Sequence, residues 1–117
     1  MFTLLTIALE AHHDALNRHR RYVVEVGRDL LGDWAVTIRF GRVGKPLRDL
    51  RFGSPDEAAM RRVVREHLQR RLSAPRRIGC AYHVASMSAE RGFAVAGWVS
   101  PRTLASLVAG CLEGDAA

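Results

Sequence analysis

Four runs of alternating hydrophobic and polar residues occupy the first half of the chain, and such alternation is typical of a half-buried β-strand. The runs cover residues 2–10, 20–26, 34–41 and 47–52. Polar and glycine-containing segments separate them and have the composition of turns and short loops. Because strands with brief connections usually pair with their neighbours in the chain, the pattern predicts a small antiparallel sheet.

A helical pattern follows the fourth run, where apolar residues recur every three or four positions. These positions are Met60, Val63, Val64, Leu68 and Leu72. Just before them, Ser54 is expected to cap the helix, Pro55 suits the first helical position and Glu57 completes a capping box. We therefore predict one main helix over residues 55–72, packed against the sheet, and an α+β fold class.

The segment after this helix carries weaker signals. We expect a linker over residues 73–77, a further strand over 78–85 and a glycine-interrupted loop over 86–97. On this basis the chain divides into a sheet-and-helix domain over residues 1–84 and a C-terminal linker and helix over 85–117.

A final helix is predicted to begin at Ser100 and Pro101 and to end at Gly114. Its apolar face comprises Leu104, Leu107, Val108, Cys111 and Leu112. The pattern leaves two roles open for this face: docking on the rest of the chain, or pairing with a second copy in a homodimer.

The composition is that of a globular protein, with 48% hydrophobic and 26% charged residues among 117. Cys80 and Cys111 are too few for a disulfide framework, so we expect free thiols in a reducing compartment. The apolar run at residues 1–9 lacks a basic flank and is shorter than a membrane span. These features favour a cytoplasmic protein that does not associate with membranes.

Positive charge is concentrated in the middle of the chain. The net charge is +6, but residues 18–77 alone hold 16 basic side chains against seven acidic ones. A basic region of this kind favours a polyanionic partner such as nucleic acid. An arginine-rich but merely solvated surface is the alternative interpretation.

The third run delivers an aromatic ring and an arginine to a turn. Phe40 is its last large residue and Arg42 follows directly after the run, and Gly41 and Gly44 beside them allow the backbone to bend. Such a pair could present a stacking ring and a phosphate-binding fork to a ligand. Phe40 also has the parity of the buried positions in its run, so the other interpretation is a core aromatic followed by a loop arginine.

The segment Phe40-Gly41-Arg42-Val43-Gly44 resembles the Trp-Gly-Arg signature of the WGR domain family, and the chain looks like a bacterial stand-alone member. Asn17, the stretches 20–22 and 29–34 and the helix start at 54–58 agree with this resemblance, which covers residues 3–84. The main departure is Phe40, which stands where the family has tryptophan.

The resemblance implies a DNA-binding role. In the poly(ADP-ribose) polymerases, WGR domains bind DNA at breaks, with the signature tryptophan against the terminal sugar and the arginine nearby. By position these roles fall on Phe40 and Arg42, with Asn17 and Arg20 reaching a phosphate. A phenyl ring has less area than indole and no N–H donor, so we expect weaker recognition of ends.

We predict a non-enzymatic module that binds DNA ends, nicks or the DNA backbone with low sequence specificity. The predicted binding residues are Asn17, Arg20, Arg39, Phe40, Arg42, Lys45 and Arg48. No nucleophile, Walker or dinucleotide motif is present. The segments His12-His13-Asp14 and Cys80-x-x-His83 match no zinc spacing, so we expect no metal or cofactor. The alternative function is a protein-interaction or assembly module that uses the Arg-rich face, and a role as accessory to a separately encoded enzyme is also open.

Overall fold

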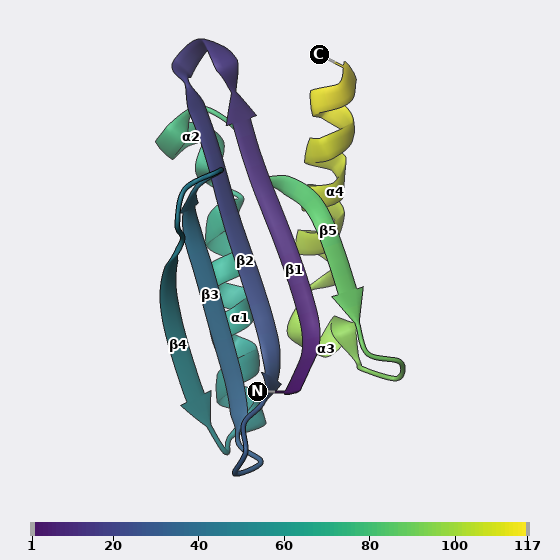
Figure 1. The fold of residues 1–117 in the computed structure, drawn as a ribbon. Helices are drawn as coiled ribbons and strands as arrows, with labels where there is room; N and C mark the ends of the chain where they lie inside the picture. The colour runs from purple at the N-terminus through teal and green to yellow at the C-terminus, as the bar shows by residue number, and fades with distance from the viewer. Residues whose placement is uncertain (1, 117) are drawn as a thin grey trace.

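A five-stranded antiparallel sheet forms the centre of the molecule (Figure 1). The computed structural model describes residues 2–116, with side chains up to residue 108. The strand order is β4-β3-β2-β1-β5, so the first four strands form a meander and the fifth joins its free edge. The strands are β1 (Phe2–His13), β2 (Arg18–Arg28), β3 (Trp34–Arg42), β4 (Arg48–Ser54) and β5 (His83–Ala89). The α+β fold class is confirmed.

One long helix covers one face of the sheet. Figure 1 shows α1 (Glu57–Arg71) behind the strands and no helix in front of them, so the sheet has an inner face toward α1 and an open outer face. The shorter elements are η1 (Asp14–Leu16), α2 (Ala74–Ile78) and α3 (Val95–Trp98), and α4 (Pro101–Ala116) runs beside β5. No helix in the described part of the chain is long and apolar enough to cross a membrane.

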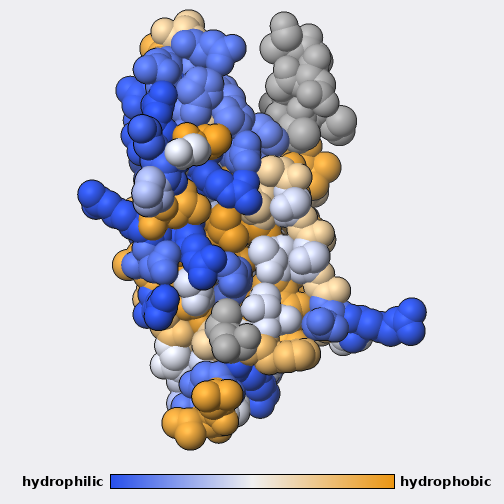
Figure 2. All heavy atoms as spheres, in the orientation of Figure 1, coloured by the Kyte–Doolittle hydropathy of each residue, from blue (hydrophilic) through white to orange (hydrophobic). Residues whose placement is uncertain are grey.

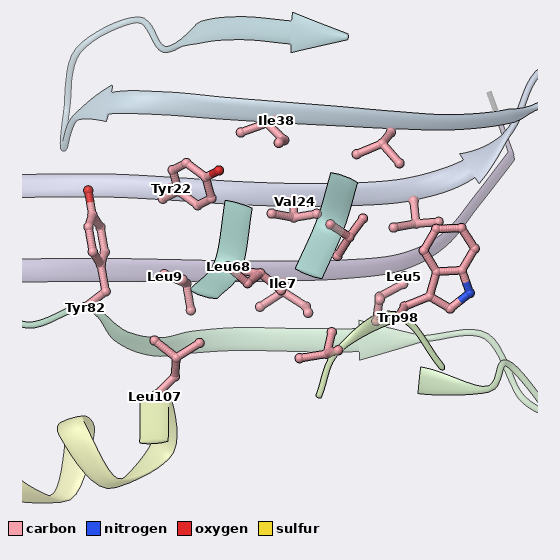
Figure 3. Packing of buried hydrophobic residues seen from close by; sticks show 14 of the residues in the cluster. Leu5, Ile7, Leu9, Tyr22, Val24, Ile38, Leu68, Tyr82, Trp98 and Leu107 are labelled. Atoms are coloured by element: carbon pink, nitrogen blue, oxygen red, sulfur yellow. The ribbon is translucent and has the colours of Figure 1, made fainter. Parts of the chain in front are cut away.

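The core lies between the inner face of the sheet and the helices (Figure 3). Alternate residues of the strands point into it, among them the fully buried Val24 and Ile38, and Leu68 of α1 packs against them. Trp98 of α3 closes one end, with its ring centroid 5.0 Å from that of Trp34. Trp34 is thus a core residue, as its place in the alternating run predicts.

The fifth strand corrects the sequence-based assignment of the C-terminal region. Residues 86–89, predicted as loop, belong to β5, which pairs with β1 from Leu5↔Ala89 to Glu10↔His83. The second edge of β1 needs backbone partners, and this demand outweighs the low strand propensity of the small residues in β5. The strand crosses the predicted boundary at residue 84, and Leu107 of α4 lies in the same core as the sheet.

Two helix ends also differ from the sequence prediction. Asp56 rather than Ser54 caps α1, because its carboxylate accepts the Ala59 N–H at 3.2 Å, while the Ser54 hydroxyl accepts the Asp56 N–H. α4 continues through Gly114 to Ala116 instead of ending there. Cys80 is a free, buried thiol. The side chains of Cys111 and Leu112 lie outside the described residues.

Candidate nucleic-acid interface

The strand register brings five predicted binding residues together at one end of the inner face. Arg20 lies directly opposite Arg42, and Phe40 lies opposite Arg48. Directly opposed residues share a face of the sheet, as do residues two apart on one strand. Asn17 joins the group through Arg42. We call these five residues the basic end of the sheet.

The side chain of Arg42 is exposed and held in place by Asn17. Its Nη1 donates to the backbone carbonyl of Asn17 at 3.0 Å, and its Nη2 donates to the side-chain Oδ1 at 2.9 Å. Asn17 follows η1 with φ of +51°, a left-handed conformation that asparagine tolerates better than most residues. Because both acceptors are uncharged, they do not offset the positive charge of the guanidinium, which also has N–H donors left for a ligand.

Phe40 is half-buried, which places it between the two sequence-based interpretations. Its ring packs on the edge of the core and also lines a pocket of about 200 Å³ between the sheet and the α1–α2 segment. The pocket is lined by Arg20, Phe40, Gly41, Arg71, Ala74, Arg77, Ile78 and Tyr82. Phe40 is therefore neither sealed in the core nor freely presented, and one part of its ring faces solvent space beside arginines.

The pocket and the basic end carry positive charge without a neighbouring negative charge. No carboxylate lines the pocket. Among the side chains of residues 2–108, none of its arginines nor of the basic-end arginines forms an ion pair with a carboxylate. On the outer face, in contrast, Arg21, Arg39 and Arg51 each pair with glutamate or aspartate. The arginines at this end of the inner face thus lack the carboxylate partners that the named arginines of the outer face have.

Two buried polar atoms beside the pocket have no hydrogen-bond partner. They are the Tyr22 hydroxyl and Nε of Arg71, and the Arg71 guanidinium lies 4.4 Å from the centroid of the Tyr22 ring. Burial raises the pKa of Tyr22 to about 12, although the positive charge of Arg71 opposes this shift. Unsatisfied donors are uncommon in folded proteins, so these two atoms mark an irregular contact between the sheet and the end of α1.

The structure does not bring Arg39 to this site. Its side chain lies on the outer face, where it pairs with Glu25 at 3.0 Å and with Asp49 at 3.5 Å. Lys45 is exposed in the β3–β4 turn, where Gly44 has φ of +83°, and its backbone N–H donates to the Arg42 carbonyl. Lys45 therefore flanks the basic end, whereas Arg39 is separated from it by the sheet.

Sequence reasoning missed the side of the pocket that comes from the α1–α2 segment. Arg71 ends α1, Arg77 lies in α2, and Tyr82 just precedes β5. In the sequence, the adjacent arginines at 70–71 and 76–77 were the only signal for this side of the pocket, because only the fold brings Arg71 and Arg77 next to Phe40.

Cys80 lies near this site as a buried thiol. Burial raises its pKa, which makes it poorly nucleophilic.

Comparison with known proteins yields no match to a family model, a curated protein or a solved structure. The resemblance to the WGR family therefore depends on the residues of this chain alone.

Proposed function

We propose that the chain is a non-enzymatic, WGR-like module that binds nucleic acid, with DNA ends, nicks or the phosphate backbone as its target. The observation that carries this proposal is the group of guanidinium groups without carboxylate partners beside a half-buried aromatic ring, all at one end of the sheet. Nucleic-acid backbones supply the negative charge and the hydrogen-bond acceptors that this group lacks.

In the proposed mode of binding, the arginines contact phosphates and the ring contacts a sugar or base. Arg42 is fixed by Asn17 and would reach a phosphate with its free donors, while Arg20, Arg48 and Lys45 would follow the backbone. The exposed part of Phe40 would pack on a terminal sugar or base. Backbone contacts carry little sequence information, so specificity for sequence should be low.

The proposal can be tested by fluorescence anisotropy with nicked, blunt-ended and circular DNA. Arg42→Ala should weaken binding to all three, because it removes a phosphate contact that each offers. Phe40→Leu should remove only the preference for ends, since leucine preserves apolar packing but cannot stack. Equal binding by wild type and both variants, with folding verified by circular dichroism, would rule out the proposed site.

A second candidate function is a protein-interaction module, and one surface feature favours it. Leu30 and Leu31, at the tip of the β2–β3 turn, are 100% and 88% exposed. Figure 2 shows a hydrophobic patch at this lower end of the molecule, away from the basic end. If protein contact is the main role, Leu30→Ser with Leu31→Ser should abolish partner capture while DNA binding stays negligible at physiological salt. The predicted homodimer contact through α4 involves side chains partly outside the described residues.

A further inference from the structure

Two histidines face each other on the outer face of the β1–β2 hairpin. His12 and His19 are directly opposed in the register of these strands, and their Nδ1 atoms lie 2.8 Å apart. A cross-strand pair of this kind is positioned by the backbone ladder and by the short turn that closes the hairpin. The adjacent His13 turns away, and its Nδ1 accepts the backbone N–H of Leu16.

The outer nitrogens of both rings face carboxylates. Nε2 of His12 lies 2.8 Å from Oε1 of Glu10, and Nε2 of His19 lies 3.5 Å from Oδ1 of Asp14. Arg21 pairs with the other oxygen of Glu10. A carboxylate oxygen accepts, so the proton of a neutral His12 ring belongs on Nε2, which donates it to Glu10.

This proton assignment leaves the lone pair of His12 Nδ1 facing Nδ1 of His19, which can donate its own proton to it at 2.8 Å. Loss of that single proton leaves two nitrogen ligands side by side for a cation. A histidine whose other ring nitrogen donates to a carboxylate is the usual arrangement around a protein-bound metal ion. The side chains are 38% and 27% exposed, so an ion and its water ligands can reach them.

We propose that His12 and His19 form a binding site for a divalent transition-metal ion, with Cu²⁺ and Ni²⁺ preferred. With metal–nitrogen bonds of about 2.0–2.1 Å, nitrogens 2.8 Å apart subtend an angle near 90° at the metal. That angle suits the square-planar or octahedral coordination of Cu²⁺ and Ni²⁺ better than the tetrahedral coordination of Zn²⁺. No group of three or more metal-binding side chains occurs in the described residues, so water completes the coordination shell.

A third imidazole lies close to the pair. His83, on β5, pairs with Glu10 in the strand register, and its ring centroid is 6.2 Å from that of His12. It is not a ligand in the observed rotamer. The site is on the face of the sheet opposite Phe40 and Arg42, so it stands or falls independently of nucleic-acid binding.

The test is calorimetric titration of the full chain, without a polyhistidine tag, with CuCl₂ and NiCl₂ near neutral pH. We expect one ion per chain, and at least a tenfold loss of affinity in His12→Gln and in His19→Gln. His67→Gln is the matched control, because His67 lies on α1 with its Nδ1 on the Val63 carbonyl, and it should bind like wild type. Equal affinities in all four proteins, or no saturable binding to wild type, would overturn the site.

A second measurement does not depend on the variants folding. In wild type, substoichiometric Cu²⁺ should broaden the imidazole NMR signals of His12 and His19 before those of the other histidines, because paramagnetic broadening is strongest for ligands. Broadening that begins at His67 or His13 would place the ion elsewhere and contradict the proposal. Acidification should release the ion, since protonated imidazoles cannot coordinate a metal.

Discussion

At the scale of single residues, the clearest departure from ordinary packing is Tyr22. Its side chain is almost fully buried next to Phe40, yet its hydroxyl has no hydrogen-bond partner and a guanidinium stacks on its ring. Alternation along β2 predicts the burial of Tyr22, but not the missing partner, which depends on the distant Arg71. The environment of Tyr22 is therefore set by the contact between the sheet and the end of α1 beside the pocket.

Replacing this tyrosine gives the first stability prediction. Tyr22→Phe should leave the free energy of unfolding near pH 7 unchanged or slightly higher, because the lost hydroxyl made no hydrogen bond. Its pKa is raised from 10.0 to about 12 in the folded chain, so above pH 10 the unfolded chain ionises first. Wild type should then lose on the order of 2 kcal/mol as pH rises toward 12, and the variant should lose less. Urea denaturation at several pH values measures this, and identical pH profiles would contradict it.

At the scale of secondary-structure elements, periodicity predicted the strands of the meander and the main helix, because each has one buried face. It placed the fifth strand too early, at 78–85 instead of His83–Ala89, and it missed α2. The short, small or charged residues of these elements carry little periodic signal, and tertiary pairing fixes β5. The start of α1 was also misassigned: Ser54 and Asp56 both suit a cap, and the strand that runs through Ser54 decides between them.

The cap of α1 can be tested directly. Asp56→Ala should destabilise the protein by about 1 kcal/mol, because it leaves the Ala59 N–H without its acceptor. Ser54→Ala should have a smaller effect, since its hydroxyl accepts only the Asp56 N–H at the end of β4. Chemical denaturation of both variants gives the comparison. A larger loss for Ser54→Ala would restore the capping box expected from the sequence.

At the scale of the whole molecule, the C-terminal segment is part of the same core as the sheet. β5 supplies the outer partner of β1, and Trp98 and Leu107 are each 1% exposed within the core. A chain restricted to residues 1–84 would lack these contacts and leave apolar surface open to water. We expect this fragment to show a poorly dispersed ¹H–¹⁵N NMR spectrum. A dispersed spectrum with the stability of the full chain would support the division near residue 84.

The candidate interface was predictable only in part. Alternation places Phe40 and Arg42 on the same face of the sheet, and the register shows why Arg20 and Arg48 lie beside them. Because successive residues of a strand point to opposite faces, Arg39 and Phe40 of β3 lie on different faces of the sheet. The ion pairs of Arg39, in contrast, depend on the neighbouring strands. The α1–α2 wall of the pocket comes from residues some thirty positions away, which no local pattern connects to the turn.

The central claim is that unpaired arginines on the inner face contact phosphates, and the salt dependence of DNA binding tests it most directly. Each lost phosphate contact should lower the slope of log K against log salt by about 0.9 on duplex DNA. Arg42→Gln with Arg48→Gln should therefore lower the slope and weaken binding. Arg39→Gln with Arg51→Gln, an equal change of charge on the outer face, should leave both nearly unchanged. Equal effects of the two double substitutions, or no affinity of wild type for DNA, would contradict the account.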